Sequence, residues 1–211
     1  NLHLIKKHPS EVKVSDYYGM PKAYIDLTKC SGCDLCRENC KFDAILVEGD
    51  YWVDDFACEG CGVCEAICPE RAVTLRPAKA GELRLYVNDS VFSTAELKMG
   101  SGTSGKLVTE VKRQMKLAAG DAGLAIIDGS PGIGCPVIAS ISGVDMVLLV
   151  TEPTVAGISD MERIISTAEK FPAQVVICVN RYDTNPDNTE KIMTMCQELQ
   201  LPFVGKIPFD P

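Results

Sequence analysis

Eight of the eleven cysteines fall into two arrays of identical spacing, and no other feature restricts the fold of this 211-residue chain as strongly. Each array reads C-x2-C-x2-C-x3-C, and the arrays consist of Cys30, Cys33, Cys36 and Cys40 and of Cys58, Cys61, Cys64 and Cys68. Residues 24–51 repeat as residues 52–79 with an offset of 28. The sequence therefore predicts two tandem copies of one unit, each with a short strand, a cysteine loop, a helical turn and a returning strand (Ala44–Val47 and Ala72–Leu75).

This cysteine spacing is typical of iron–sulfur clusters. Three thiolates on one tight loop can hold three irons of a cubane, while the fourth cysteine faces a second cluster. We therefore expect two [4Fe–4S] clusters with crossed ligands. One is expected on Cys30, Cys33, Cys36 and Cys68, and the other on Cys58, Cys61, Cys64 and Cys40. Gly32 and Gly60 are expected to let the backbone pass close to the clusters.

Structural zinc and disulfide bonds are the alternative uses of so many cysteines. Zinc sites usually draw on separated C-x2-C pairs, whereas here four cysteines share one short loop, twice over. A secretory signal, with a charged lead before an apolar segment, is not visible, which favours metal over disulfides. One departure from the usual iron–sulfur pattern is Lys41, which stands where proline commonly follows the fourth cysteine. We expect a cytoplasmic protein, and because the first residue is Asn1, either a processed chain or a fragment.

The charge of the chain limits its partners. The formal net charge is −8, which argues against nucleic acid because phosphate binding needs a basic surface. A basic redox protein or a small molecule remains possible as a partner. The longest uncharged apolar run in the C-terminal half, Met146–Val150, is far shorter than the roughly 20 residues of a membrane helix. No membrane span is expected.

Beyond residue 82, short apolar runs alternate with helical periodicity. Buried strands are predicted at Leu124–Asp128, Val144–Val150, Gln174–Asn180 and Phe203–Ile207. A helical stripe from Ile158 to Phe171 separates the second and third of these, with Ser159 and Glu162 at capping-box spacing. Another stripe, from Ile192 to Leu199, separates the third and fourth, and Pro186 lies near its first turn. Strand–helix–strand alternation predicts a parallel α/β sheet.

Polar residues follow three of these strands. They are Asp128, the segment Asn180-Arg-Tyr-Asp183, and the segment Gly205–Asp210. In open α/β sheets, the carboxyl ends of the strands form the ligand-binding edge, and a carboxylate there can hold Mg²⁺ or its water shell.

Together these motifs resemble the MinD/ParA-type P-loop ATPases, and within them the subgroup that carries an inserted dicluster ferredoxin domain. The resemblance runs from Asn1-Leu-His-Leu4, through the Asp128 strand and Thr151-Glu-Pro153, to Ile207-Pro-Phe-Asp210. It implies an α/β fold in which residues 1–21 and 80–211 form an incomplete P-loop NTPase-like domain. Residues 22–79 would be the inserted α+β ferredoxin domain.

The resemblance also implies roles for the polar residues. Asp128 would be the catalytic Walker B carboxylate beside Mg²⁺. Asn180 would read the adenine of ATP, aided by Arg181, the backbone around Pro208 and the closing Asp210. The family binds ATP between two subunits, which implies a homodimer. Its two-lysine phosphate loop precedes the point where this chain begins. We expect that part to lie upstream, and we do not expect this chain to hydrolyse ATP.

Two features leave alternatives open. Gly100–Lys106 fits G-x4-G-K, the start of a phosphate-binding loop, but Leu107 replaces the hydroxyl residue that should hold Mg²⁺. It is either a true triphosphate loop or a connection with at most a secondary anion site. Cys135, before a helix expected to open at Pro136, is either a packed small residue or a redox-active thiol.

The other conspicuous residues receive simpler interpretations. Cys178 and Cys196 are expected in the core. Tyr24 and Trp52 are expected to pack beside the clusters. His3 and His8 have no second metal ligand near them in the sequence and receive no role.

The predicted function couples nucleotide state to electron transfer, or to delivery of a metal cofactor to an acceptor protein. One alternative is a simple ferredoxin-type carrier on a nucleotide-free scaffold. Another is a scaffold for iron–sulfur cluster assembly.

Overall fold

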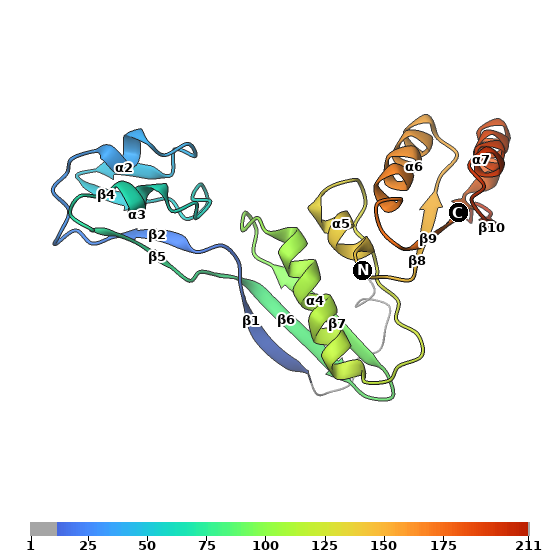
Figure 1. Cartoon of the computed structure of the whole chain (residues 1–211), viewed down its shortest axis with the longest axis horizontal. Coiled ribbons are helices and arrows are strands. Elements are labelled where there is room, and N and C mark those ends of the chain that lie inside the picture. The colour runs from blue at the N-terminus through green and yellow to red at the C-terminus, as the bar shows by residue number, and fades with distance from the viewer. Residues whose placement is uncertain (1–11, 211) are drawn as a thin grey trace. The chain divides into compact units, whose positions relative to one another are not determined.

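The computed structural model describes residues 12–210. These residues belong to two compact units whose boundary lies between Gly123 and Leu124 (Figure 1). The first unit holds two subdomains, a cysteine-rich module and an antiparallel sheet covered by a helix. His3, His8 and the Asn1–Leu4 segment lie outside the described residues.

The cysteine-rich module consists of two interlocked copies of the repeat. Its elements are β2 (Lys22–Ile25), α2 (Leu35–Glu38), β3 (Ile45–Glu48), β4 (Asp50–Val53), α3 (Val63–Ile67) and β5 (Val73–Arg76). The first strand of one copy pairs antiparallel with the last strand of the other, so that β2 pairs with β5 and β3 with β4. Strands β4 and β5 lie 28 positions after β2 and β3, so the repeat predicted from the sequence is confirmed.

The repeat extends to the backbone dihedral angles. Three pairs of positions related by the repeat have positive φ: Gly32 and Gly60, Asp34 and Gly62, and Asp43 and Arg71. Asp34 and Gly62 precede α2 and α3, where the left-handed conformation turns the chain from the cysteine loop into the helix. The two cysteine loops therefore share one backbone path.

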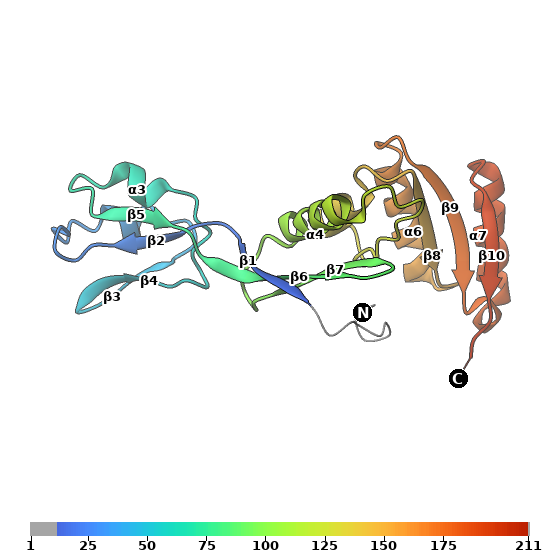
Figure 2. The ribbon, with the colours of Figure 1, turned by 90° about the horizontal axis from the view of Figure 1, so that it is seen from below.

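The antiparallel sheet of the first unit has the order β1–β6–β7. Its elements are β1 (Lys13–Tyr18), β6 (Lys79–Val87), β7 (Val91–Leu97) and helix α4 (Ser104–Ala119), which lies over one face of the sheet (Figure 2). Buried Tyr17, Ala80 and Leu83 form its core, against which Leu107 and Val111 of the helix pack. These three strands were not predicted from the sequence, although Leu83 and Leu85 alternate with Glu82 and Arg84 in β6 as in a half-buried strand.

The second unit contains a three-stranded parallel sheet with the order β10–β9–β8. Its elements are α5 (Cys135–Ile141), β8 (Met146–Thr151), α6 (Val155–Ala168), β9 (Gln174–Asn180), a 3-10 turn η1 (Tyr182–Thr184), α7 (Pro186–Glu198) and β10 (Phe203–Ile207). Met161 and Ile165 of α6 and Ile192 of α7 form one core with Ile177 of β9. Three of the four predicted strands and both helical stripes are therefore confirmed.

The predicted strand at Leu124–Asp128 and the predicted capping box are wrong. Leu124–Asp128 forms no strand, and Leu124 and Ile126 are 79% and 75% exposed, because no strand in residues 12–210 pairs with this segment. The capping box at Ser159 is wrong because α6 begins one turn earlier. There the Thr154 hydroxyl oxygen accepts a hydrogen bond from the Gly157 amide at 2.9 Å.

Strand β8 is buried on one face only. Leu149 and Thr151 point into the core, whereas Met146, Leu148 and Val150 alternate with them and are each more than half exposed. The prediction of a fully buried strand was therefore wrong for this face. Within residues 12–210, no helix is long and apolar enough to cross a membrane.

Candidate metal centre

The eight cysteines of the two arrays line two separate pockets of the module, four in each. One pocket is lined by Cys40, Cys58, Cys61 and Cys64 and encloses about 360 Å³ of empty space, partly open to solvent. The other is lined by Cys30, Cys33, Cys36 and Cys68 and encloses about 340 Å³. Each pocket thus takes three cysteines from one array and the last cysteine of the other, which is the crossed grouping that the sequence predicts.

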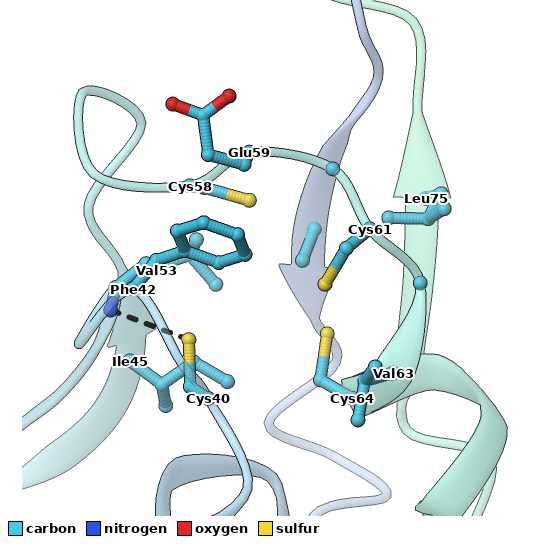
Figure 3. A pocket seen from close by; sticks show the side chains of 14 residues that line it. Cys40, Phe42, Ile45, Val53, Cys58, Glu59, Cys61, Val63, Cys64 and Leu75 are labelled. Atoms are coloured by element: carbon cyan, nitrogen blue, oxygen red, sulfur yellow. Dashed lines mark hydrogen bonds between the residues drawn. The ribbon is translucent and has the colours of Figure 1, made fainter.

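The first pocket shows how the sulfurs converge. In Figure 3 the four thiols point into a shared space, with the Phe42 ring between Cys58 and Cys40. The Glu59 carboxylate points away from the sulfurs. Val63 and Leu75 complete an apolar wall on the opposite side.

The second pocket has a more polar lining. Asp34, Glu70 and Tyr51 lie around it together with apolar Ile25 and Val73. The Tyr51 hydroxyl lies 3.0 Å from Asp34 Oδ1, to which it donates, and 3.3 Å from the Gly32 carbonyl oxygen. Tyr51 therefore holds the first cysteine loop against the hairpin of β3 and β4.

Local hydrogen bonds fix the cysteine loops in the same way in both copies. The Ala44 amide donates to Cys40 Sγ at 3.4 Å, and the Ala72 amide donates to Cys68 Sγ at 3.3 Å. Asp26 and Asp54 begin the two loops by accepting hydrogen bonds from amides two residues further on. Such contacts orient a metal ligand and stabilise negative charge on its sulfur.

Burial makes two of these thiols poor acids in the metal-free protein. It raises the pKa of the Cys36 thiol above its ordinary value, and it raises the pKa of Cys64 to about 11. A thiolate is the form that binds metal, so loading of these sites must release protons.

The donor set fits a cluster better than a single ion. Four cysteines around one pocket, partly lined by apolar side chains, instead suit the larger cubane of four irons and four sulfides.

The prediction for Tyr24 and Trp52 was wrong. Both are more than two-fifths exposed, and neither lines either cysteine pocket; the centre of the Tyr24 ring instead lies 3.2 Å from the Arg76 guanidinium carbon. Side chains alternate along a strand, and the inward residues here are Ala23, Ile25 and Tyr51. The repeat itself could have shown this, because apolar Ile25 and Val53 occupy equivalent inward positions.

The Gly100–Lys106 segment serves as a connection within the first unit. It leads into α4, and Lys106 Nζ donates to the carbonyl oxygens of Tyr18 and Gly19 at 3.3 and 3.2 Å. The Tyr17 hydroxyl lies 3.3 Å from Thr103 Oγ1. Lys106 is thus engaged with the end of β1, and this arrangement favours the structural interpretation of the motif.

The residues that the resemblance assigned to nucleotide gather in part at the carboxyl ends of the parallel strands. Arg181, in the left-handed conformation, forms an ion pair with Glu152 at 3.3 Å and lies 5.3 Å from the Phe209 ring centre. The Phe209 amide donates to Asp183 Oδ1 at 2.8 Å. The ends of β8, β9 and β10 are therefore linked by their own side chains.

The other predicted site residues occupy different surroundings. Asn180 ends β9, and its Oδ1 accepts from the Arg181 amide, while Pro208 and Asp210 follow β10. Asp128 lies in an exposed segment without regular structure.

The three cysteines outside the arrays differ in burial. Cys178 and Cys196 are buried, as predicted, whereas Cys135 is exposed at the first residue of α5. The structure therefore does not support Cys135 as a packed core residue.

Residues 23–46 match the 4Fe-4S binding domain family, so the chain contains a ferredoxin-type iron–sulfur domain. The chain is also similar to three proteins of Methanocaldococcus jannaschii. One, an uncharacterized protein, is 36% identical over 161 residues, which cover 75% of this chain and 56% of the relative. Another uncharacterized protein is 28% identical over 172 residues, covering 81% and 58%.

The third is an uncharacterized ATP-binding protein that is 26% identical over 88 residues, covering 42% of this chain and 33% of the relative. The chain spans a little over half the length of the first two relatives.

Proposed function

We propose that this chain holds two [4Fe–4S] clusters and transfers electrons, in a protein whose nucleotide state is coupled to that transfer or to delivery of a metal cofactor. The observation that carries the proposal is the division of eight cysteines into two four-cysteine pockets with crossed membership. Each such cluster accepts and returns one electron. An acceptor protein is the expected partner.

The residues of the module have distinct tasks in this proposal. Six cysteines on the two tight loops bind the clusters from one side, and Cys40 and Cys68 close each site from the other repeat. Cys33 and Cys61 are exposed, so they lie where a partner could approach. The net charge of −8 suits a basic redox partner.

The nucleotide part of the proposal is supported by the parallel sheet of the second unit. Three parallel strands are followed by Glu152, Arg181 and the segment 208–210, at the edge where open α/β sheets bind ligands. The resemblance to the MinD/ParA-type P-loop ATPases and the similarity to a relative named as ATP-binding support a nucleotide role for the complete protein. In the complete protein, ATP and Mg²⁺ would bind near Asn180 and Asp128, between the subunits of a homodimer.

Iron analysis tests the cluster assignment. Protein purified without oxygen should contain about eight irons per chain, and Cys135→Ser, the matched control outside the pockets, should contain as many. Cys40→Ala and Cys61→Ala should disturb the spectrum of the same cluster. Stoichiometric zinc with little iron would contradict the proposal. Loss of clusters to an apo-acceptor without electron transfer would favour the assembly scaffold.

A hydrolysis assay tests the nucleotide assignment. This chain should not turn over ATP, because phosphoryl transfer depends on phosphate-loop charges, and its G-x4-G-K lysine contacts carbonyl oxygens instead. Turnover that disappears in Lys106→Ala would identify Gly100–Lys106 as a real phosphate site. Turnover that survives in this variant would point to another source of phosphate contacts.

A further inference from the structure

The two cysteine pockets differ in charge although their backbones repeat. Half-buried Lys22 donates a hydrogen bond from Nζ to the carbonyl oxygen of Cys58. The repeat relates Lys22 to Asp50, and Cys58 to Cys30, in each case by 28 positions. A carboxylate cannot donate to a carbonyl, so the contact at Cys58 has no equivalent at Cys30.

The strand pairing extends this difference. Lys22 pairs in register with Arg76, so two cations end the β2–β5 ladder. At the related end of the β3–β4 ladder, Glu48 pairs with Asp50. The module therefore has one basic and one acidic strand end, placed equivalently with respect to its two cysteine loops.

Several other influences on the two sites are matched. Each pocket has one exposed cysteine and one amide donating to the sulfur of its crossed cysteine. Each pocket also has one glutamate in its lining, Glu59 in one and Glu70 in the other. The additional carboxylate at the second pocket, Asp34, is neutralised by its ion pair with Arg37. The pockets still differ in polarity, since Tyr51 lines one and Phe42 the other, and the cation at Cys58 is the difference in charge that remains.

We propose that Lys22 makes the two clusters inequivalent, by raising the reduction potential of the one on Cys40, Cys58, Cys61 and Cys64 above that of the other. This inference rests on the proposed presence of two clusters. Reduction adds one negative charge to a cluster that is already anionic with its thiolates, and a nearby cation favours the reduced state. A single electron taken from a donor protein therefore resides on the cluster held by Cys40, Cys58, Cys61 and Cys64.

Redox titration of the fully loaded chain, followed by electron paramagnetic resonance, tests this role. The unmodified chain should show two one-electron steps. Lys22→Met should lower only the upper step, by roughly tenfold in the reduction equilibrium, or about 59 mV for a one-electron couple. Lys22→Arg should leave the potential of the upper step unchanged, because it keeps the positive charge. The control Lys29→Met should shift little, because Lys29 is exposed and its charge is already paired with Asp26.

The repeat supplies a second, independent variant. Asp50→Lys places a cation at the position equivalent to Lys22 and should raise the lower step. Cysteine proton resonances near Phe42 and near Tyr51 would assign each step to its pocket, since these rings line different pockets.

A single potential for both clusters in the unmodified chain would overturn the inference. Equal shifts of both steps in Lys22→Met would overturn it as well. Far fewer than about eight irons per chain would instead contradict the proposed function.

Discussion

At the residue scale, the glycines of the two cysteine loops are needed for different reasons. Gly32 and Gly60 both have positive φ. A Cβ on Gly60 would lie 2.1 Å from the Pro21 carbonyl oxygen, whereas a Cβ on Gly32 would approach nothing closer than the Tyr51 ring at 3.9 Å. Gly60 is therefore required by contact with neighbouring backbone as well as by conformation. From the sequence, both glycines were expected to let the backbone pass close to the clusters.

This difference predicts unequal effects of the two alanine substitutions. Gly32→Ala should cost about 1–2 kcal/mol of unfolding free energy, the usual cost of a left-handed alanine. Gly60→Ala should cost at least about 1–3 kcal/mol more, because the backbone must also shift. Denaturant unfolding of the iron-loaded variants measures both. Equal losses of unfolding free energy would mean that the backbone at Pro21 moves away from the added methyl group at no cost.

At the scale of single elements, the start of α6 shows how a motif can match at the wrong place. Ser159 and Glu162 have capping-box spacing, but Ser159 lies inside the helix. The chain turns at Pro153 and begins the helix at Val155, where Thr154 caps it. Gly157 is needed there because a Cβ would lie 2.4 Å from the Glu152 carbonyl oxygen. The position of the start thus depends on how the helix meets the end of β8.

Thr154→Ala should therefore destabilise the second unit by about 1 kcal/mol, the typical cost of losing a side-chain cap. Ser159→Ala is the matched control, and it should change the stability by less than about 0.5 kcal/mol. Denaturant unfolding followed by helical circular dichroism compares the two variants. A larger loss in Ser159→Ala would restore the capping box as the start of the helix.

At the scale of the whole molecule, the two units have cores of different kinds. The core of the cysteine-rich module is made of small or medium side chains such as Ala44, Ile45 and Val73, packed directly against the cluster cysteines. The second unit buries larger side chains, among them Met161, Ile177 and Ile192, in a core without the array cysteines. Small modules with little apolar core depend on metal for their stability.

Removal of the clusters by oxidation and an iron chelator should therefore act on one unit selectively. Amide hydrogen exchange should become fast across residues 22–79, while β8, β9 and β10 remain protected. Hydrogen exchange with mass spectrometry of the full chain, before and after chelation, measures this. Retained protection in residues 22–79 would show that the module folds without metal. Loss of protection in both units would show that they unfold together.

The sequence by itself determined the features that depend on local spacing. The offset of 28 predicted the two tandem copies. The cysteine pattern predicted the crossed grouping of Cys40 and Cys68, because the fourth cysteine of such an array faces the second cluster. Apolar runs predicted β9 and β10, and Pro186 predicted the start of α7.

Only the tertiary structure decided which segments and side chains pair with one another. Leu124–Asp128 has strand composition but no neighbouring strand in the described chain, and a strand exists only when its backbone groups are paired. The inward position of Tyr51 and the reach of Lys22 to Cys58 also depend on contacts between distant segments.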